Sequence, residues 1–166
     1  MTRPAHMLLT TFGLGHMPIA SGTWGSLPPP AIAWALILLG LGPVEAPILY
    51  HAVLAAIILL YSWACVAYGT QAEARWGKKD PGQVVADETA GQCLPLIALP
   101  VMCEEPFKGM LCTGLAFIAF RIFDIIKLPP ANQLQRLPAG WGILVDDLVA
   151  GAQALIVVQV VLRLAM

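Results

Sequence analysis

The longest apolar stretch, at about 46–69, limits what this chain can fold into more than any other feature. It is apolar throughout except for His51, Ser62 and a few tyrosines. Its roughly 23 residues are enough to cross a hydrocarbon core about 30 Å thick as a helix. The stretch therefore predicts a membrane-spanning helix.

The composition agrees with a membrane protein. Of the 166 residues, 58% are apolar and only 11% are charged, whereas globular domains carry about 25% charged residues. A soluble domain of this size would leave large apolar patches exposed. The sequence predicts an all-α, small polytopic membrane helical bundle that forms a single domain over residues 1–166. The net charge is −1 and no basic tract is present, so no nucleic-acid partner is expected.

Other apolar runs extend the pattern to about 4–5 helical segments. They lie at about 31–43, from the Asp87-Glu88 segment to Met102, from the turn at 104–108 to about Ile126, and from about Leu148 to Met166. The triple proline at 28–30 opens the first of them, since proline is tolerated in the first turn of a helix. We expect two hairpins followed by a final helix.

This arrangement places the loops at 6–27, 70–92 and 127–147 on one membrane face. That face carries most of the basic residues: Arg3, Arg75, Lys78, Lys79, Lys127 and Arg136, with Arg121 close by. The opposite face carries Lys108 and Arg163. Because cytoplasmic loops are enriched in lysine and arginine, the charged face is predicted to be cytoplasmic.

The four cysteines, Cys65, Cys93, Cys103 and Cys112, lie in or beside apolar runs without a C-x-x-C spacing. Free cysteine behaves as a small, buried apolar residue. We therefore expect buried thiols rather than disulfides or zinc ligands.

Two adjacent acids, Asp87 and Glu88, need an explanation in so apolar a chain. A charged side chain at mid-bilayer costs roughly 2.5–3.5 kcal/mol, so it persists where it faces protein, water or a cation. The simpler alternative is that both acids lie at the membrane interface and favour the positive N-terminal end of a helix.

Acids recur at two further places on the same predicted face. Asp124 lies three residues from both Arg121 and Lys127, a spacing that puts all three on one side of a helix. An internal ion pair is the simpler alternative there. Asp146 and Asp147 come just before the final apolar run, where a helix N-terminal cap is the simpler alternative.

Together, these acids and cations predict a site for Mg²⁺ and phosphate. Carboxylates suit Mg²⁺, which also keeps waters and substrate phosphate oxygens as ligands. Arginine and lysine neutralise phosphate directly. The Gly-rich loop would add hydroxyls and backbone amides through Ser21, Gly22, Thr23, Gly25 and Ser26. An ordinary turn is the alternative for this loop.

Four motifs follow one another over roughly residues 10–151: Phe12-Gly13-x-Gly15 with Pro18…Ser21-Gly22-Thr23-Trp24-Gly25-Ser26, Val85-x-Asp87-Glu88, Phe120-Arg121-x-x-Asp124-x-x-Lys127, and Gly140-x-Gly142-Ile143-x-x-Asp146-Asp147-x-x-Ala150-Gly151. In this order and spacing they resemble the phosphatidylglycerophosphatase A family. The resemblance implies Mg²⁺-dependent hydrolysis of phosphatidylglycerophosphate to phosphatidylglycerol and phosphate, at the cytoplasmic side of the bacterial inner membrane. No obligate protein partner is evident.

The predicted catalytic residues are Asp87, Glu88, Arg121, Asp124, Lys127, Asp146 and Asp147. Glu88, Asp124 and Asp147 are the predicted Mg²⁺ ligands, with Asp146 as the alternative to Asp147. Arg121 and Lys127 would stabilise the phosphoryl oxygens together with the Gly-rich loop. Asp87 or the remaining aspartate would act as general base, and an aspartyl nucleophile is an alternative to water.

The chain departs from the family pattern in three places. Leu128 interrupts the usual Lys-Pro-x-Pro, Gln135 replaces an acid, and Pro138-Ala139-Gly140 replaces His-Gly-Gly. A role for that histidine or that acid cannot be transferred to this chain. The alternative functions are a non-catalytic lipid-binding protein and an ion transporter, which would place polar residues through mid-membrane.

Overall fold

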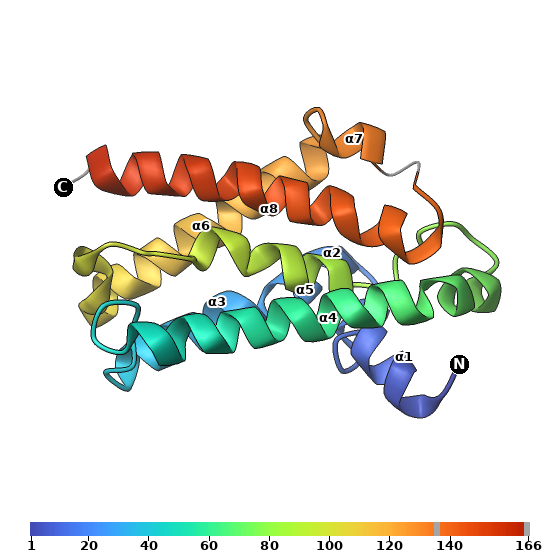
Figure 1. Cartoon of the computed structure of the whole chain (residues 1–166), viewed down its shortest axis with the longest axis horizontal. Helices are drawn as coiled ribbons and strands as arrows, with labels where there is room; N and C mark the ends of the chain where they lie inside the picture. The colour runs from blue at the N-terminus through green and yellow to red at the C-terminus, as the bar shows by residue number, and fades with distance from the viewer. Residues whose placement is uncertain (135–136, 165–166) are drawn as a thin grey trace.

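The computed structural model describes residues 1–134 and 137–164, and within these ranges all regular elements are helical (Figure 1). Gln135 and Arg136, which entered the predictions above, lie outside the described residues. The elements are α1 (Arg3–Leu9), η1 (Leu14–His16), α2 (Ser21–Ser26), α3 (Pro28–Leu38), α4 (Pro47–Trp76), α5 (Ala86–Gln92), η2 (Leu94–Leu96), η3 (Val101–Glu104), α6 (Pro106–Ile126), α7 (Ala131–Leu134) and α8 (Ala139–Leu164). Proline occupies the start of α3, α4 and α6, as predicted for the first run.

Three helices, α4, α6 and α8, are long and apolar enough to cross a membrane. Less than half of the most apolar part of each is buried inside the protein, namely 28%, 39% and 44%. Their remaining apolar side chains, such as Ile48, Leu59 and Ile125, point outward. Because an apolar surface of this extent is unfavourable in water, it faces lipid. The predicted membrane helical bundle is confirmed.

Two of the predicted apolar segments do not form full spans. Helix α3 has 11 residues, about 16 Å of helix, which is short of a hydrocarbon core about 30 Å thick. The run after Glu88 is divided into α5, η2 and η3. Pro95 lies in η2 and Pro100 precedes η3, and proline removes backbone donors that a continuous helix needs.

The predicted order of two hairpins and a final helix is nonetheless visible (Figure 1). Residues 39–46, the segment that leads into α6 and the end of α8 lie together on the left of the view, which we call the far end. Residues 77–85 and the start of α8 lie on the right, which we call the site end. The chain therefore returns to the site end after each hairpin.

Glycines allow the helices at the site end to approach closely. A Cβ atom on Gly140 of α8 would overlap the Cys65 carbonyl of α4, and one on Gly69 would overlap Gly140. A Cβ on Gly91 of α5 would lie 2.6 Å from the Asp147 carbonyl oxygen of α8. Small residues permit this kind of close packing in membrane helices. The glycines thus bring α4 and α5 against the first half of α8.

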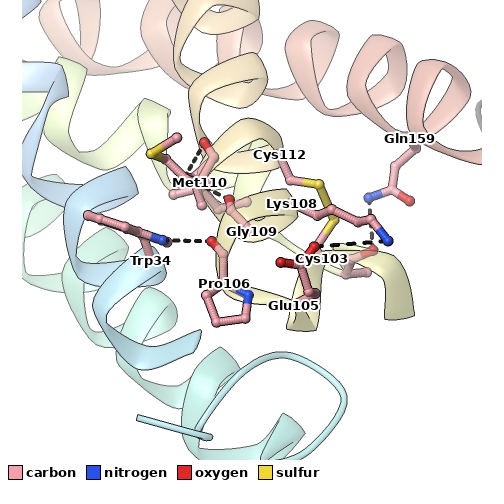
Figure 2. The surroundings of a disulfide bond; sticks show 12 residues. Trp34, Cys103, Glu105, Pro106, Lys108, Gly109, Met110, Cys112 and Gln159 are labelled. Carbon is pink, nitrogen blue, oxygen red and sulfur yellow. Dashed lines mark hydrogen bonds and ion pairs between the residues drawn. A yellow bond between two sulfur atoms is a disulfide. The ribbon is translucent and has the colours of Figure 1, made fainter. Parts of the chain in front are cut away.

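The prediction for the cysteines is wrong for one pair. Cys103 of η3 and Cys112 of α6 form a disulfide at the far end, with their Cα atoms 6.1 Å apart (Figure 2). The chain doubles back at Pro106, where the Trp34 indole donates a hydrogen bond of 3.0 Å to the Pro106 carbonyl. Sequence spacing alone does not show this reversal. Cys65 and Cys93 are buried and free, as predicted.

We predict that Gly140→Ala destabilises the protein. The added methyl would overlap backbone rather than a side chain that can move, and overpacking typically costs about 1–3 kcal/mol. Gly114→Ala is the matched control, because nothing lies within 4 Å of its added Cβ and alanine favours helix. Thermal unfolding of both variants in one detergent checks this. Equal melting temperatures would contradict the close crossing of α4 and α8.

Candidate metal and phosphate site

The acids and cations singled out in the sequence come from three helices that meet at the site end. The first turn of α5 carries Asp87 and Glu88, the end of α6 carries Arg121, Asp124 and Lys127, and α8 carries Asp146 and Asp147. The short helix α2 packs beside them. The structure therefore brings together residues that are far apart in the sequence.

Helix α5 does not use its acids as ordinary caps. Its first turn contains Asp87 and Glu88, but its N-cap, Val85, makes no side-chain capping hydrogen bond. Asp87 is buried, with 6% of its surface exposed. Hydrogen bonds fix the helix instead: the Val85 amide donates to the Leu9 carbonyl at 2.9 Å, and the Thr89 hydroxyl to the Gly25 carbonyl at 2.8 Å. The interfacial-cap alternative does not describe a carboxylate buried in this way.

Helix α8 begins at Ala139 rather than at about Leu148. Asp146 and Asp147 consequently lie inside the helix, and each is 2% exposed. This overturns the N-terminal-cap alternative, because a cap residue precedes the first helical turn. Both carboxylates are directed into the protein.

The end of α6 contains one internal ion pair and one pair to a neighbouring helix. The Arg121 guanidinium lies 2.5 Å from the Asp124 carboxylate and donates a hydrogen bond of 3.2 Å to the Ser26 hydroxyl. Lys127 ends the helix in the left-handed conformation, with φ of 50°. Its ammonium group lies 2.6 Å from Asp146 of α8.

Asp87, Glu88 and Asp147 form the tightest group of acids. One carboxylate oxygen from each lies within 4.8 Å of the others. Asp87 Oδ1, Glu88 Oε2 and Asp147 Oδ2 are buried and have no hydrogen-bond partner among the described residues. Buried polar atoms are normally satisfied, so these oxygens fit a cation with hard oxygen ligands. Asp124 is outside this group and is paired with Arg121.

The electrostatics of α5 point in the same direction. Burial raises the pKa of Asp87 well above its ordinary value, and the neighbouring Glu88 and Asp147 carboxylates raise it further. Burial also raises the pKa of Glu88, to about 7. Burial lowers the pKa of Lys127, but Asp146 outweighs this and raises it, so the amine remains a cation. The acid group therefore favours a bound proton or a metal cation.

The predicted Gly-rich loop is the helix α2. The Thr23 amide bonds to the Ala20 carbonyl, so it is already used within the chain. A Cβ on Gly22 would overlap Glu88 Oε1, and one on Gly25 would lie 2.5 Å from the Val85 Cβ. These glycines let α2 lie directly against α5. Ser21 donates a hydrogen bond of 2.6 Å to the Gly82 carbonyl and lies at the outer side of the site.

Two polar residues near the site were not singled out in the sequence. Asp80 adopts φ of 51°, and burial raises the pKa of its carboxyl while Lys127 lowers it. A left-handed conformation in a residue other than glycine is uncommon and frequent at functional sites. Gln92, one turn after Glu88, is fully buried, and its amide has no partner among the described residues. The Asp80-Pro81-Gly82 turn was a usable signal for Asp80, whereas no sequence pattern singles out Gln92.

The departures from the family pattern lie mainly in the connection to α8. The Pro129–Pro130 peptide bond is cis, and the Pro129 carbonyl accepts a hydrogen bond of 3.1 Å from Gln153. Ala139 has φ of 48°, and Gly140 packs on α4. The described residues on either side of positions 135–136 thus contact α8 and α4.

Comparison with known proteins identifies the family. A model of the family described as phosphatidylglycerophosphatase A matches residues 7–162. The chain belongs to the phosphatidylglycerophosphatase A family. Members of this family are phosphoric monoester hydrolases, so the chain is an enzyme that acts at a membrane.

Three relatives are each 34% identical to the chain. A protein of Bacteroides thetaiotaomicron named "Putative phosphatidylinositol-3-phosphatase" matches over 96% of both chains. Two proteins named phosphatidylglycerophosphatase A cover 95% and 91% of the chain, with 88% of the Haemophilus influenzae protein and 79% of the Escherichia coli protein. No match was found among solved structures.

We predict that the metal-free protein loses stability as the pH rises from 4.5 to about 7. In this range the unfolded state has released the Glu88 proton, whereas the folded state, in which the pKa of Glu88 is about 7, still holds it. Stability falls with pH wherever the folded state binds more protons.

Thermal unfolding in EDTA at about pH 5 and about pH 8 measures this difference, which Glu88→Gln should reduce. Excess Mg²⁺ should also reduce it, because a metal binds the ionised carboxylates. A melting temperature that is equal or higher at the upper pH would contradict the prediction.

Proposed function

We propose that the chain is a Mg²⁺-dependent phosphatase that converts phosphatidylglycerophosphate to phosphatidylglycerol and phosphate. The observation that carries the proposal is the group of Asp87, Glu88 and Asp147 beside two cations, Arg121 and Lys127. Carboxylates for a metal and cations for phosphoryl oxygens are the two components that phosphoryl transfer requires.

The substrate follows from the comparisons. The family description and two relatives name phosphatidylglycerophosphate chemistry, and one relative is named for phosphatidylinositol 3-phosphate. Both lipids carry a phosphomonoester on a head group that is joined to diacylglycerol through a phosphodiester. We favour phosphatidylglycerophosphate because the family model covers residues 7–162, and phosphatidylinositol 3-phosphate is the second candidate.

Three buried carboxylates are proposed as the metal ligands. Asp87, Glu88 and Asp147 each offer a carboxylate oxygen within 4.8 Å of the other two, and each has a buried oxygen without a partner among the described residues. The sequence predicted Asp124 as a ligand. Asp87 takes its place in this set because Asp124 is paired with Arg121. A bound Mg²⁺ would polarise the phosphoryl group and activate the attacking water.

The cations have separate supporting contacts. Asp124 and Ser26 both contact Nη1 of the Arg121 guanidinium, which leaves the N–H groups of Nη2 in this five-donor side chain for phosphate oxygens. Asp146 holds Lys127. We propose that Arg121 and Lys127 stabilise charge on the transferring phosphoryl group, and that Asp124 and Asp146 are positioning residues.

The distribution of the acids favours hydrolysis over ion transport. Asp87 lies in the first turn of α5, Asp124 near the end of α6 and Asp147 in the first half of α8, so the acids gather at one level of the bundle and do not follow its length. An ion path would need polar groups through the middle of the membrane.

We also propose that the site end faces the cytoplasm of a bacterial inner membrane. Arg3, Arg75, Lys78 and Lys79 belong to this end, as the positive-inside rule requires. The Cys103–Cys112 disulfide lies at the far end, and disulfides persist in oxidising compartments such as the periplasm. The two arguments are independent and agree.

Cysteine labelling in intact cells tests this orientation. Lys108→Cys, near the disulfide, should react with a membrane-impermeant maleimide in intact cells. Lys79→Cys should react only after the cells are permeabilised. The native cysteines are buried or paired, so they give a low background. The reverse labelling pattern would contradict the proposed orientation.

Phosphate release tests the activity. Wild-type protein in neutral detergent micelles should release phosphate from phosphatidylglycerophosphate with Mg²⁺ and not with EDTA. Arg121→Ala should lower kcat roughly 10²–10³-fold, as expected when one electrostatic donor is removed. Glu88→Gln should abolish both release and the rise in melting temperature on Mg²⁺ addition.

The matched control is Glu105→Gln, which changes an exposed acid at the far end. It should retain wild-type activity and the Mg²⁺ response. Full activity in Glu88→Gln, or release that EDTA leaves unchanged, would contradict the metal site. A higher kcat/KM for phosphatidylinositol 3-phosphate than for phosphatidylglycerophosphate would decide for the second substrate.

A further inference from the structure

A second polar cavity, separate from the acid group, lies at the site end. It has a volume of about 490 Å³ and is formed by residues 15–18, Ser21, Trp76, Lys78 and residues 81–83. Lys78 is its charged lining residue, and none of the lining residues is acidic. The cavity therefore suits a small anion rather than a cation.

One wall of this cavity is shared with the acid group. Ser21 lines the cavity and donates a hydrogen bond of 2.6 Å to the carbonyl of Gly82, another lining residue. The next residue, Gly22, lies directly against Glu88. Adjacent residues of α2 therefore contact the cavity and the acid group.

Other polar side chains lie at or beside the cavity. His16 lines it, and its ring lies 3.2 Å, nitrogen to nitrogen, from the ring of His6. The guanidinium of Arg75 lies 5.8 Å from the centre of the Trp76 ring, which lines the cavity. Asp80 is the nearest acid in sequence and does not line the cavity. Lys78 is therefore the charged lining group that a ligand would meet.

The rim of the cavity can accept acyl chains. Met17 lines it and is 40% exposed, and Ile19, just outside it, is 78% exposed. Exposed apolar side chains beside a polar pocket suit the boundary between lipid head groups and acyl chains. A phospholipid could place its chains along this rim with its first phosphate inside.

We propose that this cavity binds the phosphodiester of the lipid substrate, and that Lys78 recognises its charge. The inference rests on the proposed function, in which the acid group holds the terminal phosphomonoester. A lipid with both phosphates would occupy both places, with the alcohol of its head group passing beside Ser21 and Gly22. Phosphatidic acid lacks the diester and cannot make the charged contact with Lys78, so the protein would bind it less tightly than a lipid with both phosphates.

Lys78→Met tests the proposal, because methionine keeps the length of the side chain and removes its charge. Its kcat/KM for phosphatidylglycerophosphate should fall about tenfold, the effect of one charge-assisted hydrogen bond. Its kcat/KM for phosphatidic acid should stay at the wild-type value. Lys79→Met is the matched control, since Lys79 does not line the cavity, and should leave both values unchanged.

The composition of the micelle distinguishes a phosphate of the substrate from the phosphates of the surrounding lipid. All assays use neutral detergent, and a second series adds phosphatidylglycerol as a bulk anionic lipid. The substrate subsite would be wrong if Lys78→Met lowered kcat/KM only in the second series. It would also be wrong if the variant lowered kcat/KM equally for phosphatidylglycerophosphate and phosphatidic acid. Inorganic phosphate is the alternative occupant of the cavity: if it inhibits the hydrolysis of phosphatidic acid by the wild type but not by Lys78→Met, the cavity is a site for inorganic phosphate and the substrate subsite is wrong.

A binding measurement separates this inference from the proposed function. Phosphatidylglycerol carries the diester without the monoester, and its Kd in neutral micelles should rise about tenfold in Lys78→Met. If the Kd for phosphatidylglycerol differs in this way but the wild-type protein releases no phosphate from phosphatidylglycerophosphate, the proposed activity is wrong and the subsite stands. Equal Kd values for wild type and Lys78→Met would overturn the subsite, whatever the activity.

Discussion

The burial of carboxylates among apolar helices is the constraint on which the rest of the structure depends. A buried charge is costly unless it is paired, hydrogen-bonded or bound to a metal. Two of the acids are compensated by cations from the end of α6, namely Asp124 by Arg121 and Asp146 by Lys127. The remaining three are Asp87, Glu88 and Asp147, which face one another. A cation at that point would balance the charge and carry the chemistry, so the stability of the site and its function have the same requirement.

Small residues make this concentration of charge possible. Gly91 brings α5 against the backbone of α8 at Asp147, and Gly22 lets α2 lie on Glu88. The hydroxyl of Thr89 joins α5 to α2 through the Gly25 carbonyl. Ser21 of α2 lines the Lys78 cavity and the next residue, Gly22, lies on Glu88, so α2 contacts both the cavity and the acid group. One short helix therefore relates catalysis to the selection of a lipid head group.

Much of the fold could be predicted because hydropathy and the number of apolar segments between successive loops are properties of the sequence alone. The spanning helices α4 and α6 appear at 46–69 and up to Ile126, and the motifs fall at one end of the bundle. The errors have a common physical reason, since each concerns how segments pack. The pairing of Cys103 with Cys112 depends on the reversal at Pro106. The early start of α8 and the helical form of 21–26 are stabilised by contacts with α4 and α5.

The sequence by itself determined the membrane class of the protein, the types of its functional residues and the end of the bundle to which they belong. Only the tertiary structure decided which of these residues meet. Neighbouring residues of a helix point about 100° apart, so Asp146 and Asp147 face different partners, Lys127 and the acids of α5. In the same way, Asp124 lies with Arg121, and Asp80, distant in sequence from α6, comes under the influence of Lys127. These choices depend on the rotation and depth of each helix in the bundle, which the order of the residues does not record.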